Sequence, residues 1–355
     1  MTMEMQAIDV KGHIFPPGEI IAERFKISEF IGRGPFGEVF KAQDTLIEAD
    51  VALKIFHQEV IRNPLDHERF LNAARAARTL TQRNVVRLHD SGMHKEHPWV
   101  SMQHLEGLSL RKVLQMRRSK GEHFTLEELE PIVGQITLAL QHVGRDSPHG
   151  NLKPENVIFL PELVKVTDSY ILAATAPEVF SERLKESTYL APELHGSDFH
   201  ADGRCDVYSV GIIIGEMLFG EDYVPGGGDV QASPVAAIDA LCARATAFDP
   251  SERYPSVEAL SEDFATLVDT GRLLQRGSAR GESSPPPPPP PPSVAPPRSG
   301  SPPPNPLHEE TPRDIGEPLE EDLATTEVKR GELAAEIGDL LQTNEVQRGQ
   351  LPPPP

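Results

Sequence analysis

The sequence has few cysteines, no long apolar run and little basic charge. Its two cysteines, Cys205 and Cys242, cannot build a disulfide framework, and we expect a reducing compartment. The most apolar stretch, residues 207–220, contains Glu216 and is shorter than the roughly 20 residues that span a bilayer. Residues 1–10 carry two acids and no basic residue, so we expect no secretory signal. These features predict a soluble, cytoplasmic protein without a membrane span.

The scarcity of basic residues excludes two classes of partner. The 355 residues include 34 Lys and Arg against 54 Asp and Glu, which gives a net charge of −20. The first 275 residues and the last 80 are each acidic, with 27 basic against 41 acidic residues and 7 against 13. Nucleic acids and anionic membranes attract basic surfaces, so we expect neither as a general partner.

The last 80 residues lack aromatic side chains altogether. They hold 20 of the 35 prolines and only 12 Leu, Ile, Val or Phe residues, which is below the roughly 20% needed to build a core. Eight consecutive prolines at 285–292 favour extended polyproline II, which serves either as a spacer or as a ligand for protein partners. Residues 327–333 (EVKRGEL) recur as 345–351 (EVQRGQL) around a short amphipathic helix candidate. This part is therefore predicted to be a mostly disordered tail.

The first 275 residues have the pattern of an α+β fold with two parts. Alternating apolar and polar residues predict strands in the first 105 residues, and helical spacing dominates the next 170. The expected strands are residues 25–31, 51–56, 85–88 and 99–102, and a further strand that begins at residue 39. The expected helices lie at 66–81, 129–143, 206–219, 235–247 and 257–267.

A glycine-rich segment is the first motif with chemical meaning. Residues 32–39 read Gly-Arg-Gly-Pro-Phe-Gly-Glu-Val between two expected strands, and Lys54 follows on the next strand. Glycines let a backbone approach phosphates closely, and the lysine supplies a positive charge within reach of them. The segment alone is also compatible with dinucleotide binding, but no βαβ pattern follows it.

Further motifs follow in a fixed order. Residues 149–158 read His-Gly-Asn-Leu-Lys-Pro-Glu-Asn-Val-Ile, and Asp-Ser-Tyr at 168–170, Ala-Pro-Glu at 191–193 and Asp206 come after them. Together with the glycine-rich segment, this series resembles the eukaryotic-like serine/threonine protein kinases, especially their bacterial branch. The resemblance implies a two-lobed protein kinase fold. Its segments would be an N-terminal extension at 1–20, a β-rich N-lobe at 21–105, a helical C-lobe at 106–275, a Pro-rich linker at 276–318 and an acidic tail at 319–355.

The resemblance also implies a site for ATP and Mg²⁺. Asn156 and Asp168 match the magnesium ligands, Lys153 matches the lysine near the γ-phosphate, and Glu193 with Arg253 matches a structural ion pair. The positions that match nucleotide-binding residues are Gly32, Gly34, Gly37, Val39, Ala52, Lys54, Met102, Gln103, Leu105 and Ile158.

The residues that serve phosphate transfer depart from the family pattern. Asn151 stands where active relatives have the catalytic aspartate, and an amide cannot accept a proton at pH 7, so a loss of about 10²–10⁴ in rate is expected. Gly150 replaces the arginine that anchors a phosphorylated activation loop. Ala73 stands at the position of the helix glutamate that orients the lysine, which predicts that Lys54 lacks this partner. Ser169 replaces the phenylalanine that packs between the lobes.

Three functions fit this pattern. The first is a catalytically impaired member, a pseudokinase that binds ATP and acts through protein partners. The second is a weakly active serine/threonine protein kinase in which Asn151 only positions the substrate hydroxyl. The third is a kinase fold that transfers another group, such as a nucleotide, for which the residues give no positive sign.

Overall fold

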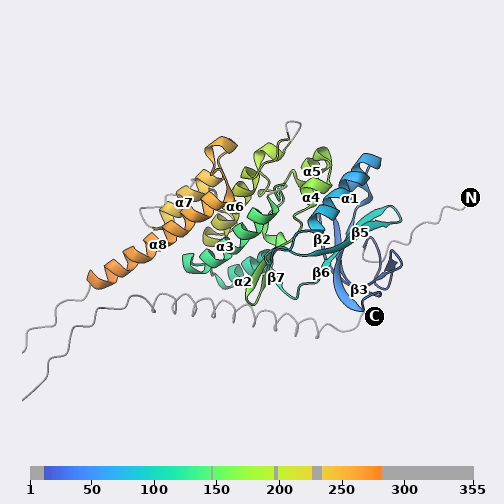
Figure 1. The fold of residues 1–355 in the computed structure, drawn as a ribbon. Helices are drawn as coiled ribbons and strands as arrows, with labels where there is room; N and C mark the ends of the chain where they lie inside the picture. The colour runs from blue at the N-terminus through green and yellow to red at the C-terminus, as the bar shows by residue number, and fades with distance from the viewer. Residues whose placement is uncertain (1–11, 145–146, 196–198, 226–233, 282–355) are drawn as a thin grey trace, which may run out of the picture.

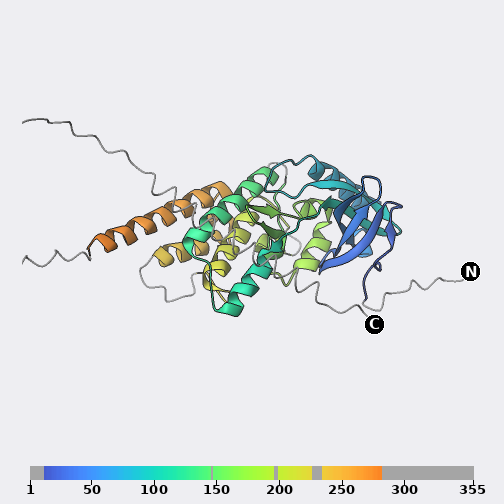
Figure 2. The ribbon, with the colours of Figure 1, turned by 90° about the horizontal axis from the view of Figure 1, so that it is seen from below.

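The computed structural model describes residues 12–144, 147–195, 199–225 and 234–281 (Figure 1). The proline run, the amphipathic candidate and the repeated heptapeptide lie outside the described residues. Figures 1 and 2 show two lobes, a twisted sheet at one end and a group of helices at the other. This arrangement confirms the α+β, two-lobed prediction.

The first lobe is built on one antiparallel sheet. Its strand order is β1-β2-β3-β4-β6-β5, so sequence neighbours pair except where β6 lies between β4 and β5. Buried aromatic and aliphatic side chains such as Phe25, Phe40 and Trp99 fill one face of the sheet, as expected for alternating strands. The strands are β1 (Ile20–Ile21), β2 (Phe25–Gly34), β3 (Gly37–Asp44), β4 (Ala49–Phe56), β5 (Leu88–His94) and β6 (His97–Gln103).

One expected strand is wrong. Residues 85–87 do not belong to the sheet, and β5 begins only at Leu88. Val85 instead forms an isolated parallel bridge with Val166 in the second lobe, and the Val86 N–H donates to the Val166 carbonyl at 2.9 Å. An apolar run of four residues looks the same whether it pairs within a sheet or joins two lobes, so the pattern alone misplaces it.

Helix α1 (Pro64–Arg78) packs against the sheet and faces the second lobe (Figure 1). It begins at Asn63, whose side chain accepts from the Asp66 N–H at 3.0 Å, and Pro64 occupies the first turn. Phe70, Ala74 and Ala77 form its buried face.

The second lobe is mainly helical. Long helices α3 and α6 pack with α8 around a core of aliphatic side chains, and a small sheet with the order β7-β8-β9 borders the first lobe. Helix α3 begins with a reciprocal capping box between Thr125 and Glu128. The helices are α2 (Leu110–Lys120), α3 (Leu126–Val143), α4 (Ile171–Ala174), α5 (Pro177–Leu184), α6 (Arg204–Phe219), α7 (Pro234–Ala245) and α8 (Val257–Gly281). The strands are β7 (Leu108–Ser109), β8 (Val157–Leu160) and β9 (Leu163–Val166).

Helix α8 extends away from the lobes (Figure 2) and continues past residue 276, where the sequence predicts a linker. Within the four described segments, no helix combines the length and apolarity needed to cross a membrane.

Candidate functional site

A buried ion pair connects the two lobes. Lys54 on β4 and Asp168, two residues after β9, approach to 2.5 Å between Nζ and Oδ2. Their side chains are 7% and 11% exposed. Asp168 has a φ of +67°, in the left-handed region that costs a non-glycine residue about 1–2 kcal/mol. The fold therefore holds a strained carboxylate against a cation, which is typical of a functional position.

Helix α1 offers Lys54 no carboxylate. Ala73 is half-buried against the apolar cluster between the lobes. Asp66 accepts from Arg62, Asn63 and Arg69 around the first turn of the helix, and Glu68 is exposed. Among the described residues, the carboxylate that pairs with Lys54 is that of Asp168.

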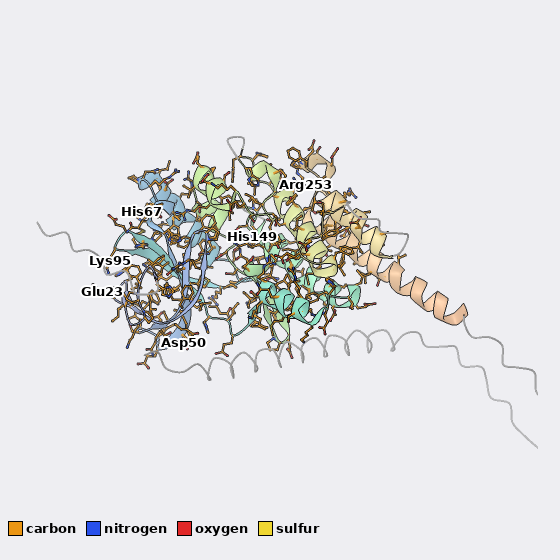
Figure 3. The ribbon with its side chains drawn as sticks, turned by 180° about the vertical axis from the view of Figure 1, so that it is seen from behind. Glu23, Asp50, His67, Lys95, His149 and Arg253 are labelled. Atoms are coloured by element: carbon orange, nitrogen blue, oxygen red, sulfur yellow. The ribbon has the colours of Figure 1, made fainter. Side chains whose placement is uncertain are left out.

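A second buried carboxylate fixes the loop at 149–156. Asp206 on α6 accepts the backbone N–H groups of His149 and Gly150, both at 2.8 Å. His149 lies at the centre of the molecule (Figure 3), where its Nε2 is 2.9 Å from the Thr167 carbonyl oxygen. Burial raises the pKa of Asp206, while its two backbone donors oppose that shift. Asp206 thus holds the start of this loop through backbone groups and not through the side chain at position 151.

Glycine is required at position 150 for a physical reason. Its φ is +63°, and a Cβ there would lie 2.6 Å from Cδ2 of Leu172 on α4. An arginine at this position would need both the left-handed backbone and the movement of Leu172.

The polar side chains of this loop gather near Asp168. The side-chain amide of Asn156 donates to the backbone carbonyl of Asn151 at 2.8 Å. The backbone carbonyl of Asn156 accepts the N–H of Thr167, the residue before Asp168. Burial lowers the pKa of Lys153, and Lys153 is close enough to feel both Asp168 and Lys54. The Asn151 side chain is buried and forms no hydrogen bond with the residues that the structure describes.

Most of the non-glycine positions that match nucleotide-binding residues lie together. Val39 is paired with Lys54 between β3 and β4, and Ala52 with Met102 between β4 and β6. Val39, Ala52, Met102 and Leu105 belong to or pack against one apolar cluster. The remaining two residues differ: the Gln103 N–H donates to the Arg87 carbonyl at 2.9 Å, and Ile158 lies on β8 outside the described cluster.

The three glycines lie on the β2–β3 hairpin. Gly34 pairs with Gly37 beside the turn, and Gly32 pairs with Val39. At Gly37 a Cβ would lie 2.1 Å from the Ile55 carbonyl oxygen, so packing alone demands glycine there. At Gly32 no atom lies within 4 Å of such a Cβ, and at Gly34 only the Gly37 oxygen does, at 4.0 Å. Gly32 and Gly34 therefore border open space on the hairpin.

Comparison with known proteins decides the family. The protein kinase domain matches residues 25–277, most of the chain. This chain belongs to the protein kinase family. Serine/threonine-protein kinase PknL of Mycobacterium tuberculosis is 28% identical over 271 residues, covering 70% of this chain and 67% of PknL. PrkC of Bacillus subtilis is 27% identical over 284 residues, covering 73% of this chain but only 43% of PrkC.

Solved structures agree on the fold. The kinase domain of Mycobacterium tuberculosis PknI superposes with a TM-score of 0.59 at 21% identity, covering 72% of this chain and 99% of that one. The relatives support a bacterial serine/threonine kinase origin, as the motifs predicted.

The apolar contact between the kinase lobes is filled in an unexpected way. The replacement of the family's phenylalanine by Ser169 predicts a contact with fewer apolar side chains, whereas Tyr170 fills it. Tyr170 is 2% exposed and its ring lies edge-on to Phe56 at 6.3 Å, beside Phe70 and Ala74 of the same cluster. Burial raises the pKa of its phenol. The aromatic side chain has moved one position along the chain, which a search for the family's phenylalanine at 169 does not detect.

A contact between the glycine hairpin and α5 was not predicted. Arg183 donates to the Pro35 carbonyl at 2.6 Å and pairs with Glu59 at 3.2 Å. Phe36, 2% exposed at the hairpin tip, lies against Phe180 with ring centroids 5.8 Å apart. We call these contacts the hairpin latch. Pro35 and Arg183 are 148 residues apart, and no local signal in the sequence connects them.

The predicted structural ion pair is present. Arg253 donates to both oxygens of Glu193, at 2.7 and 2.8 Å, and its side chain is fully buried (Figure 3). Its remaining donors bind the carbonyls of Ala247, Arg204 and Phe248. Such a saturated guanidinium anchors the helical lobe and does not face Asp168.

Proposed function

We propose that this chain is a signalling protein of the protein kinase family that binds ATP with Mg²⁺, transfers phosphate poorly or not at all, and acts through protein partners. The observation that carries the proposal is Asn151. It stands in a loop whose backbone is fixed by Asp206, so the loop conformation is retained while the proton acceptor is missing. The neighbouring carboxylates are engaged elsewhere: Asp168 with Lys54, and Glu155 with Arg111 at 2.9 Å.

The residues present fit a magnesium nucleotide. Asp168 and the amide oxygen of Asn156 are hard oxygen donors of the kind that Mg²⁺ prefers. Lys54 and Lys153 supply two positive charges beside them. When bound, ATP would provide the phosphoryl group; the chain's own part would be to neutralise its charge and orient it. Asn151 can hold a substrate hydroxyl by a hydrogen bond but cannot take its proton.

The backbone of the 149–156 loop, fixed by Asp206, also favours a second candidate, a weakly active serine/threonine kinase. Phosphoryl transfer depends mostly on positioning and electrostatics, and both lysines remain near Asp168. The proline-rich segment and the tail are our candidates for contacting protein partners in either case.

Transfer from γ-labelled ATP separates the two candidates. We would compare the full chain with Lys54→Ala and Asn151→Asp, offering the chain itself and generic proteins as acceptors, with Mg²⁺ or Mn²⁺. We expect no incorporation by the wild type and none by Asn151→Asp. If the wild type incorporates labelled phosphate and Lys54→Ala abolishes this, the proposal of a catalytically impaired protein is refuted and the weakly active kinase is supported.

Nucleotide binding needs a separate readout. Thermal unfolding with MgATP should show a higher midpoint for the wild type, because a ligand that binds only the folded state stabilises it. The same nucleotide should leave Asp168→Asn unshifted. Absence of any shift for the wild type would contradict the ATP-binding part of the proposal.

A further inference from the structure

A basic cavity lies on the seam between the lobes, away from Lys54 and Asp168. Its volume is about 390 Å³, and none of its lining residues is acidic. Arg83 and Arg87 come from the segment between α1 and β5, His89 from β5, and Lys165 from β9 of the helical lobe. The other lining residues are Leu80, Thr81, Gln82, Val85 and Gln103.

Lys165 is the unusual member of this set. Its side chain points into the cavity wall at only 9% exposure, and its ammonium donates to the Val85 carbonyl at 3.2 Å. An ammonium has three N–H donors, so one carbonyl does not satisfy it. Burial and the charge of Arg83 lower its pKa. A buried cation without an acidic neighbour is costly to the fold.

The two arginines are also unpaired. Both residues are exposed, and neither guanidinium forms a hydrogen bond or ion pair with any described residue. The charge of Asp44 is close enough to affect the pKa of His89. The Asp44 carboxylate, however, already accepts hydrogen bonds from Nε and Nη2 of Arg24. The whole chain has a net charge of −20, so a cavity lined by three cations and no carboxylate differs in charge from the rest of the protein.

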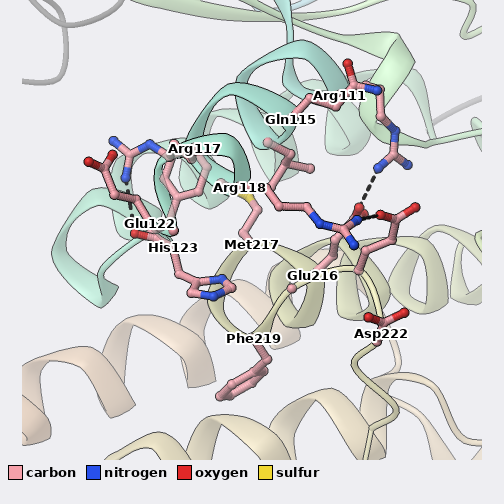
Figure 4. A pocket seen from close by; sticks show the side chains of 15 residues that line it. Arg111, Gln115, Arg117, Arg118, Glu122, His123, Glu216, Met217, Phe219 and Asp222 are labelled. Carbon is pink, nitrogen blue, oxygen red and sulfur yellow. Dashed lines mark hydrogen bonds and ion pairs between the residues drawn. The ribbon is translucent and has the colours of Figure 1, made fainter.

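A second cavity of the same chain shows the contrast (Figure 4). It is about 280 Å³ and lies between α2 and the end of α6. Its three arginines, Arg111, Arg117 and Arg118, each bind a glutamate, namely Glu216, Glu128 and Glu221. The arginines of that cavity are therefore paired with glutamates, while those of the basic cavity have no acidic partner among the described residues.

We propose that the basic cavity binds a phosphate group, held by Arg83 and Arg87 on one lobe and by Lys165 on the other. A guanidinium group can bind two phosphate oxygens at once. Three cations balance the two negative charges of a phosphate better than the single charge of a carboxylate. The phosphate belongs either to a small phosphomonoester or to a phosphorylated side chain. The lining of this cavity includes neither Lys54 nor Asp168, so it is a separate site from the proposed nucleotide site.

Occupancy of this cavity would act on the connection between the lobes. Arg87 accepts the Gln103 N–H through its carbonyl, and Val166, next to Lys165, exchanges hydrogen bonds with Val86 and Asn84. Strand β9 leads from Lys165 to Asp168 within three residues. A ligand that ties Lys165 to the arginines would stabilise the strand that presents Asp168.

The test uses the full chain and isothermal calorimetry with inorganic phosphate, pyrophosphate and a phosphoserine peptide. Lys165→Met and Arg87→Gln should each weaken binding about tenfold or more, the usual effect of losing a charged hydrogen bond. Arg118→Gln, in the self-paired cavity, is the matched control and should not change it. Lys165→Met should also raise the unfolding midpoint without ligand, because it removes an unpaired buried charge. A folded variant that keeps the wild-type affinity would overturn the proposal.

Lys54→Met separates this site from the nucleotide site. Phosphate binding that survives Lys54→Met and is lost in Lys165→Met supports the basic cavity. The reverse result places the phosphate at Lys54 and overturns the proposal, as does absence of binding to the wild type. Within a supporting result, tighter binding of the peptide than of free phosphate identifies a phosphorylated protein as the source, and equal affinity identifies a small phosphomonoester.

Discussion

Replacing Arg183 with alanine should increase the affinity of this protein for nucleotide. The hairpin latch holds the turn between Gly34 and Gly37 against α5, through Arg183 on the Pro35 carbonyl and Phe180 on Phe36. In protein kinases this hairpin covers the phosphates of ATP. A hairpin bound to α5 cannot adjust to a nucleotide until those contacts release.

The size of the effect follows from the geometry. A hydrogen bond from a charged donor contributes about 1.5–3 kcal/mol, and the lower end applies because the Arg183 side chain is 22% exposed. If loss of this hydrogen bond favours the binding-competent hairpin by about 1.5 kcal/mol, the apparent Kd falls roughly tenfold. Glu59, the other partner of Arg183, is 73% exposed, so Glu59→Ala should change the Kd less than about threefold.

The assay is equilibrium titration of the full chain with a fluorescent ATP analogue and Mg²⁺. Arg183→Ala, Glu59→Ala and the wild type are compared after circular dichroism shows that all three are folded. An unchanged or higher Kd for Arg183→Ala would refute the latch. Equal gains in both variants would trace the effect to the exposed ion pair instead.

Three further predictions concern stability, measured by urea unfolding. Gly150→Ala should cost about 1–2 kcal/mol from the left-handed backbone alone, plus the displacement of Leu172; a change below 0.5 kcal/mol, roughly the range of a neutral surface substitution, would contradict this. Arg253→Ala should cost about 3–5 kcal/mol, because it leaves Glu193 without its bidentate partner, and an unchanged midpoint would argue against the pair. The hydrogen bonds from Arg24 hold the pKa of Asp44 below its ordinary value, so its ionised form stabilises the fold above about pH 4 and loses this contribution as the pH falls further. Asp44→Asn should therefore be less stable at pH 7 and should lose less stability on acidification than the wild type; parallel pH profiles would show that Asp44 is not involved.

The sequence predicts the fold because its signals are local and repeated. Alternation defines the strands of the first lobe, and helical spacing defines the helices, whose observed starts after Asn63 and Thr125 lie a few residues before the predicted ones. The departures at Asn151 and Ala73 are equally readable, since the motif fixes what each position should hold. Sequence alone does not show the response to each departure, because the responses come from residues far along the chain.

Two features illustrate this limit. Lys54 and Asp168 are individually recognisable, but their direct pairing across 114 residues depends on the lobes meeting. Arg83 reads as part of a solvated helix face with Arg75 and Arg78. In the structure α1 ends at Arg78, so Arg83 lies beyond the helix and contributes to the basic cavity.

Other residues occupy the places left by the departures from the kinase pattern. With Ala73 on α1, Lys54 pairs with Asp168, a residue that the family pattern retains. Ser169 withdraws an aromatic ring from between the lobes, and Tyr170 supplies it from the next position. Gly150 withdraws a cation and permits both the left-handed turn and the close approach of Leu172. Restoring one family residue at a time would therefore meet contacts already formed here, as an arginine at position 150 would meet Leu172.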